Sequence, residues 1–183
     1  MKKHYVLGDI EESYRRTLPT HSKHKKRLSN YIGKLVQCGR YLEAGYYFSD
    51  LYEISSDHKK TIKLGYSIAI HSFDNDGVLK YDKLLVDSGS DFCELMMLRL
   101  RYYHSRNNLS ACEVTSCELL DKKLAKLDLS IIVEICIGRQ SYLIAEPLAR
   151  HLVRNRLVLP YDVNKLLKEI IIIKLIEIIR CVK

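Results

Sequence analysis

The chain has 183 residues, 47% of them hydrophobic, and a formal net charge of +8. No linker rich in Pro, Gly or Ser divides it, so we expect a single domain over residues 1–183. Its longest apolar run, 170–173, is far shorter than the roughly 20 residues of a membrane span, and no secretory leader follows the start. We therefore expect a soluble, cytoplasmic protein with reduced cysteines. The positive charge favours an anionic partner.

The N-terminal part predicts a short helix followed by a basic segment. Residues 9–18 favour a helix because Asp9 suits its first turn or cap, and Pro19 would end it. The segment 21–27, with the sequence HSKHKKR, then concentrates positive charge. Two interpretations stay open: it is a solvated lead into the next helix, or it is a contact site for an anion.

The central part of the chain carries a repeating pattern. The segment 39–44, GRYLEA, is followed by Phe48 and Leu51, and similar positions return 34, 34 and 33 residues later. Within each repeat, apolar residues are spaced as on one face of a helix. Six columns keep this phase: Leu28, Ile62, Met96 and Leu129; Ile32, Tyr66, Leu100 and Val133; Leu35, Ala69, Tyr103 and Cys136; Tyr41, Asn75, Leu109 and Tyr142; Ala44, Val78, Cys112 and Ala145; Leu51, Leu85, Leu119 and Leu152.

This pattern resembles the tetratricopeptide repeat, in which a Gly forms the turn and a Tyr and a small residue pack the helix pair. The resemblance covers residues 26–158. It implies an all-α fold, a right-handed solenoid of about four helix pairs with a concave groove. The segments 73–77 and 106–108 replace the usual Gly-x-Tyr turn. An irregular helical bundle with accidental spacing is the alternative.

The C-terminal segment 161–181 predicts a long and unusually apolar helix that begins after Pro160. Such a helix should be covered on more than one side. One interpretation is that it caps the fourth repeat. The other is that it forms an interface with a second copy or a larger partner. For the interface we expect contacts at Ile171, Ile172, Leu175 and Ile179.

The resemblance also implies where a ligand would bind, because the first helix of each pair lines the groove. The exposed positions between the core columns give the expected binding residues: Asn30, Gln37, Lys63, Ser67, His71, Met97, Arg101 and Glu134. Three of them, Lys63, His71 and Arg101, make the groove positive. Asn30 and Gln37 can bond to an extended peptide backbone. These residues favour a ligand with acidic character or a free carboxylate.

We therefore expect a protein-interaction module, such as an adaptor, a chaperone or a subunit of a larger complex. The alternative is a basic helical-repeat protein that binds RNA, which the +8 charge and the segment 21–27 favour. No phosphate-binding loop, nucleophile motif or metal-ligand spacing is present in the sequence. We accordingly predict no enzyme, no catalytic residue, no metal and no cofactor.

Overall fold

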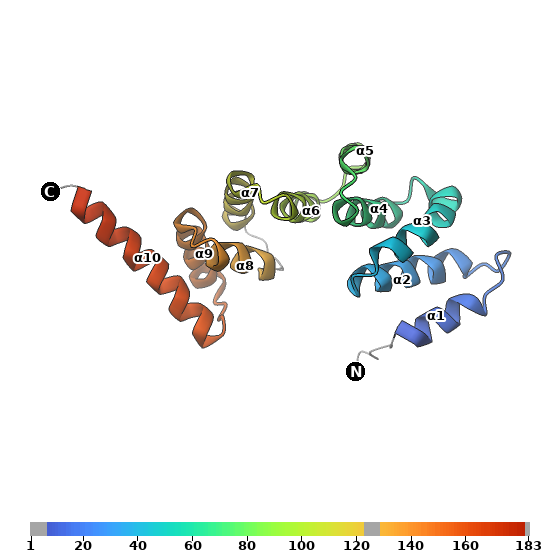
Figure 1. The fold of residues 1–183 in the computed structure, drawn as a ribbon, viewed down its shortest axis with the longest axis horizontal. Coiled ribbons are helices and arrows are strands. Elements are labelled where there is room, and N and C mark those ends of the chain that lie inside the picture. Colours follow the sequence, from blue (N-terminus) through green and yellow to red (C-terminus); the bar gives the residue numbers. More distant parts are fainter. Residues whose placement is uncertain (1–6, 123–128, 182–183) are drawn as a thin grey trace. The chain divides into compact units, whose positions relative to one another are not determined.

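The computed structural model describes residues 7–122 and 129–181, except for the side chains of residue 175 and residues 177–181. The described residues form ten α-helices and no strand (Figure 1). The all-α prediction is confirmed at this level. The chain divides into two compact units, an N-terminal unit (Met1–Asp91) and a C-terminal unit (Phe92–Lys183). The expectation of one domain stays a prediction.

Each unit contains five helices. Those of the N-terminal unit are α1 (Leu7–Arg15), α2 (His24–Gln37), α3 (Tyr41–Ser55), α4 (Lys59–His71) and α5 (Asn75–Asp87). Those of the C-terminal unit are α6 (Phe92–Ser105), α7 (Leu109–Asp121), α8 (Ser130–Gly138), α9 (Tyr142–Asn155) and α10 (Tyr161–Cys181).

Helix α1 differs from the predicted range 9–18, because it begins two residues earlier and ends at Arg15. Pro19 therefore does not end it. Thr17 follows the helix, and its hydroxyl donates to the Ser13 carbonyl at 2.7 Å. The Arg27 guanidinium also donates to the Ser13 carbonyl, at 3.1 Å, and it donates to the Thr17 hydroxyl. These bonds tie the end of α1 to α2.

The same three-residue turn joins α2 to α3, α4 to α5, α6 to α7, and α8 to α9. Its middle residue has a left-handed backbone with φ between 52° and 74°, and the next N–H donates to a carbonyl five residues back at 2.9–3.0 Å. This is the bond that closes a helix in the Schellman motif. The left-handed residues are Gly39, Phe73, Asn107 and Gln140. They repeat at intervals of 34, 34 and 33 residues.

Five of the six predicted columns form the hydrophobic cores. The columns that begin with Ala44 and Leu51 are at most 6% exposed at every member. The three columns of the first helices are buried or half-buried throughout. The column that begins with Tyr41 differs, because Asn75 and Leu109 are exposed. Its members are the first residues of their helices, where packing against the partner helix is weakest.

Helix α10 packs one face against the core of the C-terminal unit. Leu167 is buried there, and Ile170 and Ile171 are half-buried against the same core. This face contacts α8 and α9. None of the described helices is long and apolar enough to cross a membrane.

The repeated turn makes a prediction about stability. Replacing Gly39 by Ala should lower the free energy of unfolding by about 1 kcal/mol, because an L side chain is strained at φ 74° although nothing crowds its Cβ. Replacing Gln140 by Gly should raise it by about 0.5 kcal/mol, because that strain is removed. Urea unfolding followed by circular dichroism measures both changes. A loss of stability in Gln140→Gly would contradict a left-handed turn at that position.

Candidate functional site

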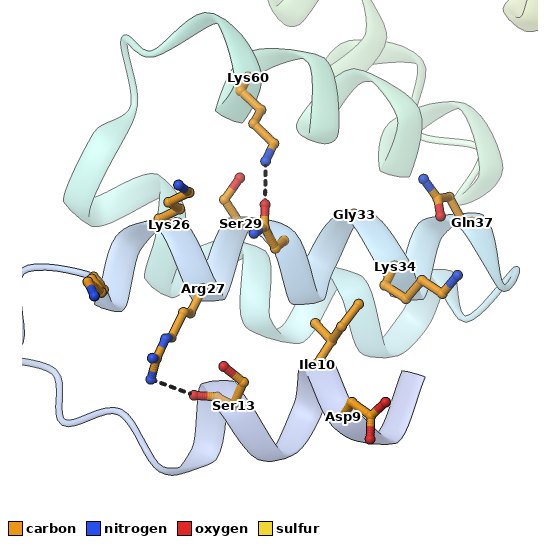
Figure 2. Close-up of a pocket in the computed structure, with 12 residues that line it drawn as sticks. Asp9, Ile10, Ser13, Lys26, Arg27, Ser29, Gly33, Lys34, Gln37 and Lys60 are labelled. Carbon is orange, nitrogen blue, oxygen red and sulfur yellow. Dashed lines mark hydrogen bonds between the residues drawn. The ribbon is translucent and has the colours of Figure 1, made fainter. Parts of the chain in front are cut away.

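A basic cleft in the N-terminal unit is the most distinctive concave feature of the described residues. It has a volume of about 750 Å³ and lies between α1, α2 and α4 (Figure 2). Most of its lining comes from one face of α2. The lining residues are Asp9, Ile10, Ser13, Lys23, Lys26, Arg27, Ser29, Asn30, Gly33, Lys34, Gln37 and Lys60. Five of them are basic and only Asp9 is acidic.

The core side of α2 determines which residues face the cleft. Leu28, Ile32 and Leu35 are fully buried at helical spacing. Because successive residues of a helix are turned by about 100°, this anchoring leaves Lys26, Asn30 and Gln37 on a different face. Their exposure agrees, since all three are exposed. The cleft face is therefore fixed by hydrophobic burial on the side opposite to it.

A cluster of tyrosine rings holds α1 in place as one wall. The rings of Tyr14 and Tyr31 stack with centroids 5.4 Å apart, and Tyr47 meets both of them edge-on. The Tyr31 hydroxyl donates to Glu43 at 2.9 Å. Burial, and then this bond to a carboxylate, raise the pKa of Tyr31 above its usual value.

Most of the cleft's positive charge has no neutralising partner. Within the part of the chain that the structure describes, Lys23, Lys26, Lys34 and Lys60 form no ion pair with a carboxylate. The Lys60 ammonium donates to Asn30 Oδ1 at 2.8 Å (Figure 2). Burial, and then the nearby Lys26 ammonium, lower the pKa of Lys60. Both lysines are exposed by surface area, so solvent screens the repulsion between them.

The starts of α2 and α4 add to this potential. Neither helix has an acidic residue in its first turn, although the positive end of the helix dipole favours one. Helix α2 begins with HKKR, and α4 begins with KK. These cations oppose the dipole, so they reduce helix stability while they strengthen attraction for an anion.

One buried hydroxyl in the cleft lining lacks a hydrogen-bond partner. Ser29 is 7% exposed, and its Oγ makes no hydrogen bond. Leaving a buried hydroxyl unsatisfied costs about 1–3 kcal/mol. Ser55 is also buried with an unpartnered Oγ, but it does not line the cleft. Ser29 is thus the unsatisfied hydroxyl that lies beside the unpaired lysines.

The cleft collects two of the eight residues that the sequence predicts for a binding groove, Asn30 and Gln37. It also holds three residues of the basic segment 21–27, namely Lys23, Lys26 and Arg27. Lys26 and Lys23 are free of ion pairs there, whereas Arg27 ties α1 to α2. The placement favours the interpretation of this segment as an anion contact.

The other predicted groove residues of the N-terminal unit lie on α4 and do not line the cleft. The His71 ring stacks on Tyr41 with centroids 3.8 Å apart. The Ser67 hydroxyl donates to the Lys63 carbonyl at 3.0 Å. Both arrangements are local packing on α4 and its neighbour.

The predicted groove residues of the C-terminal unit have different environments. Arg101 is exposed, and Glu134 is exposed with its Oε1 3.5 Å from His104 Nε2. Met97 corrects the prediction, because it is only 9% exposed and belongs to the hydrophobic core. Helix α6 buries Met96, Met97 and Leu98 in succession. Such a wide buried face leaves no exposed position between the core columns at Met97.

Helix α10 also shows an apolar surface that no described residue covers. Its outer face, defined here as Leu166, Ile172, Ile173 and Ile176, has side chains that are 43–56% exposed. Of the four predicted contact residues, Ile172 lies on this face and Ile171 packs partly against the core. The side chains of Leu175 and Ile179 lie outside the described residues.

Three thiols of the C-terminal unit, those of Cys112, Cys117 and Cys136, have a raised pKa. Burial raises the pKa of Cys112 and Cys117, and it raises the pKa of Cys136 to about 11. A thiol reacts through its thiolate, so a raised pKa slows its reactions. Among the described residues, His, Cys, Asp and Glu form no group of three or more that could hold a metal ion.

Comparison of the chain with protein families, with curated proteins and with solved structures finds no match. The resemblance to tetratricopeptide repeats therefore stays a prediction, and the cleft's own chemistry is what bears on function.

The crowded lysines generate a prediction. Replacing Lys60 by Gln should raise the free energy of unfolding by about 0.5 kcal/mol at low salt, the scale of a solvent-screened charge interaction. The gain should shrink as salt screens the repulsion. Replacing Lys25, an exposed lysine of α2 that does not line the cleft, is the matched control. Thermal unfolding at low and high salt measures both. A destabilised Lys60→Gln protein would show that the bond to Asn30 outweighs the repulsion.

Proposed function

We propose that this protein is an interaction module that holds an acidic segment of another protein in the basic cleft. The observation that carries the proposal is a set of four lysines that pair with no carboxylate among the described residues, on a face that also presents Asn30 and Gln37. Unpaired cations attract acidic side chains and speed association. Amide side chains can bond to the peptide backbone. The cleft's volume is within the range of ordinary ligand sites.

The cleft lining favours a peptide over single-stranded RNA. Proteins that bind single-stranded RNA usually stack its bases on aromatic rings. None of the residues that line the cleft is aromatic. Two rings of the adjoining tyrosine cluster, those of Tyr14 and Tyr31, stack on each other. RNA binding through the +8 charge is the second candidate, and it would rest on phosphate contacts alone.

We also propose that α2 to α9 form four tetratricopeptide-like helix pairs of a right-handed solenoid, with α1 before them and α10 as the cap. The recurrence of one left-handed turn at intervals of 34, 34 and 33 residues supports this arrangement. The burial of five of the six repeat columns supports it as well. The packing of Leu167, Ile170 and Ile171 supports the capping role of α10.

The outer face of α10 is the second proposed contact surface, and a second copy of the chain is the proposed occupant. Four large apolar side chains at 43–56% exposure lie on one side of this helix, and a contiguous apolar patch is typical of an interaction surface. The partner helix of a second copy would carry the same apolar surface, and a two-fold interface brings identical surfaces together.

Binding of an acidic peptide tests the first proposal. The full chain should bind a fluorescein-labelled oligo-glutamate, and the dissociation constant should rise with salt because the attraction is electrostatic. Replacing both Lys23 and Lys34 by Gln should weaken binding about fivefold. Replacing Lys25 and Lys83 by Gln removes the same charge outside the cleft and should change little.

Fluorescence anisotropy measures these constants, with a labelled Gly-Ser peptide as the uncharged control. Tighter binding of oligo-uridylate than of oligo-glutamate at equal salt would contradict the peptide proposal and favour RNA as the ligand. Equal binding of both glutamate and Gly-Ser peptides would contradict the electrostatic basis.

The outer face of α10 makes a separate prediction. In light scattering, the wild-type chain should self-associate as its concentration rises. Replacing Ile172 and Ile173 by Glu should leave a monomer of unchanged helix content, because the interface would bury carboxylates that have no partner. Replacing Lys25 and Lys83 by Glu adds the same carboxylates at exposed lysines away from α10 and should preserve self-association. A wild-type monomer at all concentrations would contradict the interface.

A further inference from the structure

One part of the cleft has the chemistry of a site for a single oxyanion. Figure 2 shows Lys26, Ser29 and Lys60 on the side of α2 that faces α4, whereas Asp9 lies on α1 at the other side of α2. Asn30 joins the first group through its bond to the Lys60 ammonium. We propose that Lys26, Ser29, Asn30 and Lys60 form a subsite that binds one carboxylate or phosphate group of the ligand. The subsite rests on the proposed function of the cleft.

Every available polar group in this subsite is a donor. The two ammonium groups can only donate. Asn30 Oδ1 already accepts from Lys60, so the amide nitrogen of Asn30 is the group that it could still offer to a ligand. The Ser29 hydroxyl has no partner, so its proton is also available. The Ser29 hydroxyl can also accept, but four donors suit a group whose oxygens accept, and the two positive charges favour a negative group.

The hydroxyl of Ser29 is the feature that points to a specific site and not to diffuse attraction. Lysines on a surface attract anions at any angle, whereas a hydroxyl in the cleft lining defines one position. Ser29 is only 7% exposed, and its Oγ is covered from solvent. A ligand reaches this hydroxyl only after neighbouring atoms shift.

The Lys26 and Lys60 ammonium groups show why an anion would stabilise this place. Both side chains are exposed, and the positive charge of Lys26 contributes, after desolvation, to the lowered pKa of Lys60. An oxyanion between them would convert this repulsion into two charge-assisted hydrogen bonds. The free protein thus holds an unfavourable arrangement that binding relieves.

The test compares Ser29→Ala with Ser55→Ala. Each variant removes a buried hydroxyl without a partner, so each should raise the thermal midpoint of the free protein. Only Ser29→Ala should weaken binding, by about tenfold for a lost bond to a charged group. Lys26→Gln should weaken binding by a similar factor, whereas its neighbour on the same helix, Lys25→Gln, should not.

Two probes are used. Binding of inorganic phosphate is measured by the thermal midpoint and by nuclear magnetic resonance shifts, and binding of labelled oligo-glutamate is measured by anisotropy. A phosphoserine peptide of equal charge separates the two sources of the oxyanion. If the phosphoserine peptide binds more tightly, the subsite is assigned to phosphate. If oligo-glutamate binds more tightly, the subsite is assigned to carboxylate. Either result supports the subsite when Ser29→Ala reduces the preference.

Two outcomes would overturn the inference separately from the proposed function. If oligo-glutamate binds the wild type and both Ser29→Ala and Lys26→Gln bind it equally well, the subsite is refuted while the cleft retains its role. Equal weakening by Ser29→Ala and Ser55→Ala would trace the effect to general stability and would also refute the subsite. If no acidic peptide binds even at low salt, the proposed function itself fails.

Discussion

The two-sided character of α2 is the constraint on which the rest of the N-terminal unit depends. One side of this helix buries Leu28, Ile32 and Leu35 completely. Each such side chain contributes about 1.5–3 kcal/mol when it is fully buried, so the rotation of the helix about its axis is fixed. The opposite side must then present its cations and amides to α1 and α4, which are held by the tyrosine cluster and by the bond from Lys60 to Asn30. The cleft is a consequence of this rotation, and its chemistry follows from which residues the sequence puts on the second face.

The recurring turn has the same backbone geometry even where the sequence lacks the usual Gly. A Gly at the left-handed position is the usual signal, and only Gly39 provides it in the four helix pairs described above. Phe73, Asn107 and Gln140 take the same conformation despite their side chains, at a cost of roughly 1–2 kcal/mol each. The bond to the carbonyl five residues back and the side-chain caps of Asp74 and Asn108 on the next helices offset that cost. The turns therefore recur where the sequence alone departs from the repeat pattern.

The sequence predicted the core of this protein better than it predicted the site. Apolar periodicity is a property of neighbouring residues, so the columns of Ala44 and Leu51 could be found by counting. The cleft instead requires contacts between α2 and α4, which lie far apart in sequence, and nothing local identified Lys60 as the neighbour of Lys26. Ser29 was missed for a related reason, because a lone serine in a helix gives no signal until its environment is known. The prediction that Met97 is an exposed groove residue was wrong, because the width of a buried helix face depends on how many neighbours cover it.

The cleft combines three arrangements that each lower the stability of the free protein. Cations begin α2 and α4 against their dipoles, two ammonium groups lie near each other, and a buried hydroxyl lacks a partner. Any one of them occurs by chance, as Ser55 and Ser116 show for the hydroxyl. Their coincidence in one lining is harder to attribute to chance, because a single ligand would relieve all three at once. A negatively charged acceptor group satisfies the hydroxyl, neutralises the ammonium groups and complements both helix ends. Under the proposed function, one bound group would therefore lower the energy of all three arrangements together.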